Sequence, residues 1–358
     1  MSVPSFSEQS PARICIHAPN WVGDVVMATP LMRSVRRNFT SSRILLLVRN
    51  NVEPVVKKAP WFDEVVTYPA GGVSGTFAFW RTMARLRREA FDLGLILPNS
   101  FKTALLFFMG GVENRVGYIR DARRFMLHHP LPRPGENGEF HPVYMADYYL
   151  GLGKGIGLNH SDSTTELHFC EEDVSRTRSI LKSQCIDPDR RIFLLHPGAA
   201  YGPSKKWRNR RWARLAELLE NSFDVEICLI GGEQEAETCR RIQALSGADV
   251  SNLQGSKIDL HLLKCLVSMS DLLVTTDSGP RHYGVACSIA TVCLMGPTHP
   301  DYSTSGRPHD IVIQCTPECG PCQKKVCPED HRCMENISPR LVFSHCLGAL
   351  MKNGTYEK

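Results

Sequence analysis

The sequence predicts an α/β protein built from two doubly wound, Rossmann-like units. Apolar runs typical of buried strands alternate with segments of helical periodicity almost throughout the chain, which indicates parallel sheets. The alternation begins again after a polar region at residues 153–165 and the Asp-Pro-Asp segment at 187–189. A chain of 358 residues is long enough for two domains of ordinary size, each with its own core.

The first half contains four expected strands and the helices between them. The strands are residues 14–18, 44–48, 65–68 and 93–97. A helix is expected after Asp24, where Leu31, Val35 and Phe39 recur at four-residue spacing. Further helices are expected at residues 79–90, 101–109 and 143–152. Residues 131–140, rich in proline and glycine, are expected to form a loop.

The second half repeats this pattern. Strands are expected at residues 192–195, 225–230, 272–275 and 290–294, and helices at 211–219, 234–245, 283–287 and 338–351. Ser338 followed by Pro339 is typical of a helix start. We therefore place one domain at residues 13–170 and a second at 185–337, followed by a C-terminal helix and tail at 338–358.

Composition excludes several functional classes. The hydrophobic fraction of 42% and the charged fraction of 22% are typical of a soluble globular protein. A net charge of +5 is weak evidence for nucleic-acid binding, and no nucleic-acid partner is expected. The first twelve residues lack a basic start followed by an apolar core, and the apolar run at 105–111 is too short to span a bilayer. These features predict a cytoplasmic protein.

The turn from Asn20 to Asp24 lies between an expected strand and an expected helix. Such a strand–glycine–helix segment brings polar groups to the edge of an open sheet. Asp24 would lie at a helix N-terminus, where the helix dipole favours its ionised form. An ionised carboxylate there can accept a proton from a substrate hydroxyl. The alternative is that Asp24 is a simple helix cap.

Three polar clusters directly follow strands of the second half. The first, residues 196–207, contains Lys205 and Lys206, either of which can supply a cation for phosphate. The second, residues 231–235, contains two glutamates that could hold ribose hydroxyls. The third, residues 275–282, combines an aspartate with the start of a helix, which is an anion site. Taken singly, each cluster is also compatible with an ordinary loop, a helical first turn or a cap.

Together the clusters describe a pocket for a ribose, a diphosphate and a sugar, with Asp24 facing it from the other domain. That is the layout of a nucleotide-sugar glycosyltransferase. The full Gly-x-Gly-x-x-Gly pattern of a nicotinamide dehydrogenase and the Gly-Lys-Ser/Thr ending of a Walker loop are both missing from this sequence.

At these residues the sequence resembles the bacterial lipopolysaccharide heptosyltransferase family, and most closely its type II members. The resemblance runs from about residue 14 to residue 308. Its anchors are the segments Trp21–Asp24, Leu97–Lys102, His196–Trp207 and Thr276–Gly279 with His282, followed by Gly296-Pro297-Thr298. It implies a GT-B fold, with two Rossmann-like domains facing across a cleft. It also implies transfer of L-glycero-D-manno-heptose from ADP-heptose, with inversion, to the first heptose of a Kdo–lipid A core.

The resemblance also implies roles for single residues. Asp24 matches the base that deprotonates the acceptor, and Lys205 matches the lysine that contacts diphosphate and heptose. Glu235 is the better match to the ribose carboxylate, with Glu233 a near rival. Asp277 matches the residue that holds heptose hydroxyls. The remaining donor-side matches are Ser278 and Gly279, for phosphate-binding amides, and His282.

The acceptor side is expected in the first domain. Asn99, Ser100 and Lys102 match an acceptor-side segment of the family. The arginines at positions 120, 123 and 124 could meet acceptor phosphates or Kdo carboxylates, or could serve only as surface charges. The implied acceptor is linked to lipid A, so we expect transient association with the inner face of the cytoplasmic membrane. No Asp-x-Asp pair lies beside the motifs, and no cofactor is expected to be required.

The segment at residues 315–333 is rich in cysteine, and runs similar to it occur in some members of the family and are absent from others. The close spacing of Cys319, Cys322, Cys327 and Cys333 is compatible with a structural zinc site. Reduced thiols and disulfides are the alternatives, and the cytosolic location argues against disulfides. Three alternatives for the whole chain also stay open: a type I enzyme acting on Kdo, a transferase for another nucleotide sugar, and a non-catalytic binding module.

Overall fold

The computed structural model describes residues 10–69, 72–136, 139–159 and 162–352. The chain divides into two compact units, residues 1–168 and 169–358, which are treated separately below. This division places helix α7 (Glu171–Ser183) in the second unit, where it packs against α10 (Leu262–Ser268). The domain boundary expected near residue 170 lies close to this division. No helix among the described residues is long and apolar enough to cross a membrane.

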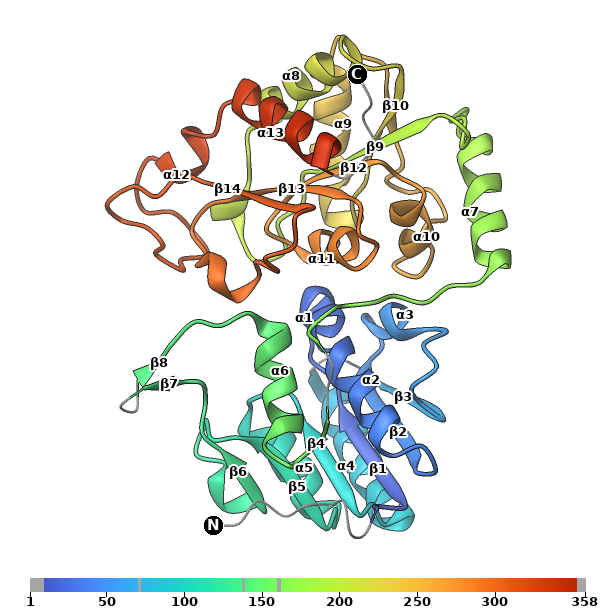
Figure 1. Cartoon of the computed structure of the whole chain (residues 1–358), viewed down its shortest axis with the longest axis vertical. Coiled ribbons are helices and arrows are strands. Elements are labelled where there is room, and N and C mark those ends of the chain that lie inside the picture. The colour runs from blue at the N-terminus through green and yellow to red at the C-terminus, as the bar shows by residue number, and fades with distance from the viewer. Residues whose placement is uncertain (1–9, 70–71, 137–138, 160–161, 353–358) are drawn as a thin grey trace. The chain divides into compact units, whose positions relative to one another are not determined.

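The first unit is built on a parallel sheet, in blue to green in Figure 1. In the described residues this sheet has six strands in the order β3-β2-β1-β4-β5-β6. The strands are β1 (Arg13–His17), β2 (Arg43–Arg49), β3 (Glu64–Tyr68), β4 (Leu93–Ile96), β5 (Asn114–Tyr118) and β6 (His129–Leu131). The order reverses direction between β1 and β4, and ligands of doubly wound sheets bind at this point, beyond the carboxyl ends of the strands.

Helices cover both faces of the first sheet. They are α1 (Val22–Met27), α2 (Thr29–Asn38), α3 (Glu53–Val56), α4 (Gly72–Glu89), α5 (Phe101–Met109), the 3₁₀ turn η1 (Arg124–Met126) and α6 (Met145–Lys154). The helices α2 and α6 pack together, as do α4 and α5. The helix expected after Asp24 is interrupted at Ala28, because Pro30 lies in the first turn of α2 and cannot continue the hydrogen bonding of α1.

One prediction for this unit is wrong. Residues 131–140 are not simply a loop, because Leu131 ends strand β6 and β7 (Gly135–Glu136) pairs antiparallel with β8 (Glu139–Phe140). β6 contains Pro130, which cannot donate to a sheet, and such a residue is tolerated because β6 is an edge strand. The strand β5 was also absent from the prediction.

The second unit repeats the topology of the first. Its sheet is parallel and, in the described part of the chain, has six strands in the order β11-β10-β9-β12-β13-β14. These strands are β9 (Arg191–His196), β10 (Val225–Leu229), β11 (Val250–Asn252), β12 (Leu272–Thr276), β13 (Ala290–Met295) and β14 (Asp310–Gln314). The direction of winding changes between β9 and β12, as it does between β1 and β4. The edge strands β11 and β14 were not expected.

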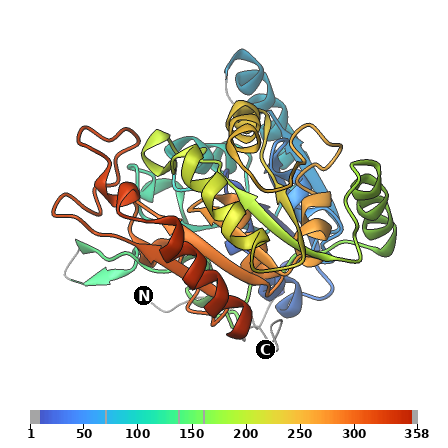
Figure 2. The same cartoon turned by 90° about the horizontal axis from the view of Figure 1, so that it is seen from above.

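Two helical layers enclose the second sheet as well. The helices are α7, α8 (Asn209–Glu220), α9 (Ala236–Leu245), α10, α11 (Gly279–Ala286), α12 (Arg332–Glu335) and α13 (Pro339–Lys352), with the 3₁₀ turns η2 (Pro203–Lys205), η3 (Glu233–Glu235) and η4 (Pro300–Tyr302). Figure 2 shows α13, in red, beside the yellow-green α8. The hydroxyl oxygen of Ser338 accepts from the Leu341 amide at 3.2 Å, which confirms the expected cap. The C-terminal helix thus packs on the second unit, with Cys346 and Leu350 in its core.

Candidate active site

The three polar clusters of the second unit meet at the carboxyl ends of the adjacent strands β9, β10 and β12. The Thr276 hydroxyl donates to the carbonyl of Gly198, and His196 Nδ1 lies 3.2 Å from the Ser278 hydroxyl. A Cβ placed on Gly198 would lie 2.6 Å from the His196 ring and 3.0 Å from Glu235 Cγ. The close approach of these clusters therefore requires glycine at position 198.

A buried ion pair between Lys205 and Asp277 forms the centre of the site. The Lys205 ammonium donates to Asp277 Oδ2 at 2.5 Å and to the backbone carbonyl of Asp277 at 2.9 Å. The two side chains are only 7% and 9% exposed. The same ammonium lies 4.8 Å from the centroid of the Tyr201 ring, at a cation–π distance. Lys205 is thus a fixed cation, whereas its neighbour Lys206 is exposed.

The Asp277 carboxylate is fully used by the protein itself. Besides Lys205, Oδ2 accepts from Thr298 at 2.7 Å, while Oδ1 accepts from Ser303 at 3.0 Å and faces Arg281 at 3.5 Å. Burial alone would raise the pKa of Asp277, but the charges of Lys205 and Arg281 lower it well below its ordinary value. A carboxylate offers about four lone-pair sites, and four donors occupy them here.

The expectation that Asp277 accepts hydroxyls of the sugar stays a prediction. In the structure its charge holds the ammonium of Lys205 and the guanidinium of Arg281 in place. We therefore also assign Asp277 a positioning role toward these two cations.

A second buried ion pair supports the first. Arg281, which is fully buried, donates from Nε and Nη2 to the two oxygens of Asp310 at 3.1 and 3.0 Å. Asp310 also accepts from the Ser305 amide and hydroxyl. Sequence reasoning missed this pair. Arg281 lies within the third cluster, but its partner is on the edge strand β14, whose position the sequence pattern did not indicate.

The start of α11 presents a neutral, polar surface. Ser278 is the N-cap residue, yet its side chain makes no cap bond, because its hydroxyl contacts His196, Thr275 and the carbonyl of Thr276. Burial lowers the pKa of both His196 and His282 to about 4, so both rings are neutral at pH 7. Gly279 begins the helix, where backbone amides and the helix dipole favour an anion.

Of the two rival glutamates, Glu235 is the one that reaches the site. Its Oε2 accepts from the Gly232 amide at 2.9 Å, so it also closes the first turn of η3. Glu233 is exposed. Glu235 can close this turn and also bind ribose hydroxyls, because the bond from the Gly232 amide uses only one of its two carboxylate oxygens.

The cysteine-rich segment packs directly against the turn that carries Lys205. The Ser204 amide donates to the Lys325 carbonyl at 3.1 Å, and its hydroxyl to the Lys324 carbonyl at 2.6 Å. The Tyr201 hydroxyl donates to the Gln323 carbonyl at 2.5 Å, and His331 Nε2 donates to the Ser204 carbonyl at 2.5 Å. The segment therefore packs on the η2 turn and supports the position of Lys205.

The cysteines of this segment are free thiols. Burial raises the pKa of Cys333, and Cys327, Cys322 and Cys319 are close enough to raise it further. Among the described residues, no three His, Cys, Asp or Glu side chains are placed to hold one metal ion. The zinc site expected at these four cysteines therefore stays a hypothesis, which metal analysis can test.

In the first unit, Asp24 is the third residue of α1. The N-cap residue is Trp21, so Asp24 lies within the first turn and is not itself the cap. The phenol of Tyr149 on α6 hydrogen-bonds the Asp24 carboxylate. Burial, together with the charge of Asp24, raises the pKa of Tyr149 well above its ordinary value, so the phenol remains a donor. Asp24 is partly exposed.

The expected acceptor residues fall into two groups. Arg123 is fully buried and donates to the carbonyls of Tyr118 and Pro98 and to Asn99 Oδ1, so it is not available to an acceptor anion. The Asn99 amide is held at its other end by Tyr148, to which it donates at 2.8 Å. The expectation that Arg123 contacts the acceptor is thus corrected to a positioning role for the segment around Asn99.

The other group is accessible. Arg120, on the loop after β5, and Arg124, the first residue of η1, are both exposed. Ser100 caps α5 by accepting from the Thr103 amide at 3.3 Å, and Lys102 extends from the first turn of that helix. These positions leave the expected acceptor roles of Ser100, Lys102, Arg120 and Arg124 open to test.

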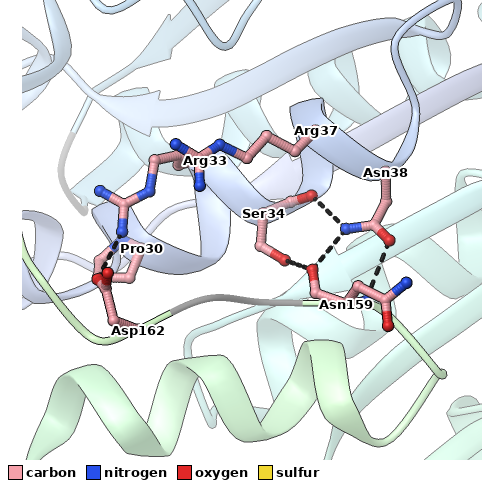
Figure 3. A pocket seen from close by; sticks show the side chains of 7 residues that line it. All are labelled: Pro30, Arg33, Ser34, Arg37, Asn38, Asn159 and Asp162. Atoms are coloured by element: carbon pink, nitrogen blue, oxygen red, sulfur yellow. Dashed lines mark hydrogen bonds and ion pairs between the residues drawn. The ribbon is translucent and has the colours of Figure 1, made fainter.

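A polar pocket beside α2 is excluded as a ligand site by its own contacts. Figure 3 shows Arg33 paired with Asp162, while Ser34 and Asn38 bond the backbone of Asn159. Arg33 also pairs with Glu166 at 3.2 Å. These contacts attach the segment after α6 to α2, so we assign this pocket a structural role.

Comparison with known proteins shows the relatives of the chain. Residues 79–332 match the profile described as Glycosyltransferase family 9 (heptosyltransferase). Lipopolysaccharide heptosyltransferase 2 of Escherichia coli (strain K12) is 27% identical over 350 residues, which cover 95% of this chain and 98% of the relative. Lipooligosaccharide heptosyltransferase 2 of Haemophilus ducreyi (strain 35000HP) is 27% identical over 320 residues, covering 84% and 88%.

Solved structures share the fold. The ADP-heptose LPS heptosyltransferase II of E. coli aligns with a TM-score of 0.79 and 22% identity, covering 96% of this chain and 99% of that one. A glycosyltransferase family 9 protein from Veillonella parvula DSM 2008 aligns with a TM-score of 0.85 and 19% identity, covering 95% and 98%. The predicted GT-B fold class is confirmed.

Proposed function

Since this chain belongs to glycosyltransferase family 9 and is therefore a glycosyltransferase, we propose that it transfers L-glycero-D-manno-heptose from ADP-heptose to the first heptose of the Kdo–lipid A inner core in lipopolysaccharide biosynthesis. The observation that carries this proposal is the buried Lys205–Asp277 ion pair where the three polar clusters meet, in a chain whose relatives along 95% of its length include a heptosyltransferase 2. Donor chemistry and acceptor chemistry are assigned to different units.

The second unit binds the donor in this proposal. Lys205 and the first turn of α11, with Ser278 and Gly279, bind the diphosphate and stabilise the charge that develops on it as it leaves. Glu235 binds the adenosine ribose. His282, neutral and buried beside Lys205, adds no further positive charge to the site. Asp277 and the Arg281–Asp310 pair keep the lysine in position.

The first unit supplies the base. The Asp24 carboxylate takes the proton of the acceptor hydroxyl as its oxygen attacks the anomeric carbon of heptose. The bond from that carbon to the ADP β-phosphate oxygen breaks in the same step, which inverts the configuration. The Tyr149 phenol orients the carboxylate. A positioned general base contributes about 10²- to 10⁴-fold in rate.

The acceptor and the location follow from this assignment. An acceptor linked to lipid A places the enzyme in the cytoplasm, at the inner face of the inner membrane, where it associates transiently and peripherally. Ser100 and Lys102, with the exposed Arg120 and Arg124, contact the core oligosaccharide. The reaction as proposed requires no cofactor, and a zinc bound by the cysteine-rich segment would be structural.

A donor panel tests the proposal. Release of the nucleoside diphosphate is measured with ADP-heptose, ADP-glucose and UDP-glucose in the presence of a heptose-terminated core. We expect ADP-heptose to give by far the highest kcat/KM, because the relatives of this chain are heptosyltransferases. Equal or faster turnover of another nucleotide sugar would identify a different transferase, and no turnover with any donor would favour a binding module.

A further inference from the structure

A small cavity in the first unit has no assigned ligand. It measures about 150 Å³, and its lining includes the last residues of three strands, His17, Arg49 and Tyr68, together with Phe79 on α4 and Lys102 on α5. A cavity of this size holds about five waters, or one charged group with part of a sugar ring. It lies where ligands of doubly wound sheets bind.

The polar groups at the base of the cavity form a chain with fixed proton positions. Burial lowers the pKa of His17 to about 4, so its ring is neutral. Nδ1 donates to the Ala18 carbonyl at 3.1 Å, which leaves Nε2 to accept from the Tyr68 hydroxyl at 3.2 Å. Arg49 in turn donates to the Tyr68 oxygen. These contacts consume the acceptors at the base of the cavity.

The donors that remain are cationic. Arg49 Nε is buried and has no partner among the described residues. Lys102 forms no ion pair in the described part of the chain, and its ammonium lies 5.7 Å from the centroid of the Phe79 ring. None of the described residues that line the cavity is acidic. A buried donor without a partner is costly, so this lining favours a ligand that brings oxygen acceptors and negative charge.

The walls fit a saccharide. Phe79, Pro69 and Leu106 supply apolar surface for the C–H face of a sugar ring, while Ser100 and Thr103 add hydroxyl-bearing residues to the lining. The cavity also touches the turn that leads to Asp24, because Asn20 lines it and its Oδ1 lies 3.4 Å from the Tyr68 hydroxyl oxygen. Asn20 is four residues before Asp24.

We propose that this cavity binds an oxyanion carried by the acceptor saccharide, a carboxylate or a phosphate monoester, through Arg49 and Lys102. This inference rests on the proposed function, since it names the anionic group by which that acceptor is recognised. Arg49, Tyr68 and His17 become specificity residues. The anion completes the coordination of Arg49 Nε, and Tyr68 connects the bound anion to the turn that leads to Asp24.

The test measures binding of a lipid-free heptosyl–Kdo disaccharide to the full chain by titration calorimetry. Three forms of this probe are compared: the carboxylate, the same disaccharide with its carboxyl reduced to an alcohol, and the reduced disaccharide with a phosphate monoester on the heptose. The variants are Arg49→Gln and Lys102→Gln, with Arg88→Gln, exposed on α4, as the charge-matched control. Lys102 is exposed, so its variant keeps the fold even where Arg49→Gln lowers the melting temperature.

We expect at least one anionic form to bind wild type ten-fold or more tightly than the reduced form. Arg49→Gln and Lys102→Gln should each bind that form roughly 10- to 100-fold more weakly than wild type, because each loses one charge-assisted hydrogen bond. Arg88→Gln should bind it as tightly as wild type. The reduced form should bind all proteins alike. The form that binds tightly identifies the carboxylate or the phosphate as the recognised group.

Three results would overturn the proposal: no binding of any form by wild type, equal binding of the reduced and both anionic forms, or unchanged anion binding in both cavity variants. Failure of the proposed function is distinguished from these results, because it shows as absent heptose transfer. Calorimetry does not depend on transfer.

Discussion

Replacing Asp277 with asparagine tests whether its carboxylate serves as a counter-ion for Lys205 and Arg281 or only as a ligand for the sugar. The side chain keeps its size but loses the charge that faces Lys205 at 2.5 Å and Arg281 at 3.5 Å. Lys205 and Arg281 are almost wholly buried, so water cannot replace the missing charge. If Asp277 only accepted hydroxyls from the donor, its loss would affect substrate binding and leave the fold unchanged.

The expected cost of Asp277→Asn is large. Removing one partner of a buried ion pair costs about 3–5 kcal/mol. For a unit of the size of residues 169–358, each kcal/mol lowers the melting temperature by about 2–4 °C, so we expect a loss of roughly 6–20 °C. Because the folded-state pKa of Asp277 is lowered, its contribution is fully present above the unfolded pKa of about 4 and is lost only below it. The difference should therefore be constant from pH 6 to pH 8.

Scanning calorimetry of the full chain measures this loss, and titration with ADP measures donor-side binding in the same samples. Asp224→Asn is the matched control, because Asp224 pairs with Arg190 on the surface and is 91% exposed. Surface pairs contribute about 0–1 kcal/mol. If Asp277→Asn melts within 2 °C of Asp224→Asn, the counter-ion role is refuted.

Four further predictions follow from the site. Asp24→Asn should lower kcat by about 10²- to 10⁴-fold with ADP affinity unchanged in calorimetry, whereas normal turnover would exclude Asp24 as the base. Gly202→Ala should raise the donor KM, because its Cβ would lie 2.4 Å from the Lys325 carbonyl and displace the Lys205 turn; Gly348→Ala, whose Cβ meets nothing within 4 Å, should match wild type in the same kinetic assay. Because the pKa values of His17, His196 and His282 are lowered, the unfolded chain takes up protons between pH 6.5 and pH 4 that the folded chain does not. The free energy of unfolding should therefore fall as the pH drops, by roughly 2 kcal/mol for each histidine between pH 7 and pH 5. His196→Gln should flatten this pH profile in calorimetry, and an unchanged slope would contradict the assignment. The zinc hypothesis predicts one zinc per purified chain by elemental analysis and its loss in the Cys319→Ser/Cys322→Ser variant; metal-free wild type would contradict it.

The central strands of both sheets were predictable because they are buried on both faces. Strands β1 and β9 are continuous apolar runs, since helices cover each side of a parallel sheet. Of the edge strands, β3 was expected at residues 65–68, but β6, β11 and β14 were missed. β6 is three residues long and contains proline, and β14 is partly exposed, so neither carries the pattern of a buried strand. These strands form because they pair with a neighbouring strand of the sheet, and the local sequence gives no sign of that pairing.

The meeting of the three polar clusters was predictable, but the contacts of their side chains were only partly so. A parallel sheet brings the carboxyl ends of its strands together, so the clusters at Gly198, Glu235 and Asp277 had to meet. The pairing of Asp277 with Lys205 joins residues 72 positions apart and depends on how the η2 turn folds back. A sequence shows that a carboxylate is present, but it does not show which donors already occupy it.

The first unit illustrates the same limit for arginines. Arg120, Arg123 and Arg124 look alike in the sequence, yet Arg123 is buried among carbonyl oxygens while the others are exposed. Arg49 ends a buried strand and gave no sequence signal of a ligand. Its importance comes from one unpaired nitrogen in a cavity, which only the packing of the surrounding side chains reveals.

The most direct test of the central claim is a transfer assay with two acceptors. The purified chain is incubated with ADP-heptose and a lipid A core that ends in heptose or in Kdo, and the products are identified by mass spectrometry. The account predicts addition of one heptose to the heptose-terminated core, with release of ADP. Transfer only to the Kdo-terminated core would contradict the assignment of the second-heptose reaction, and transfer to neither core would contradict heptose transfer itself.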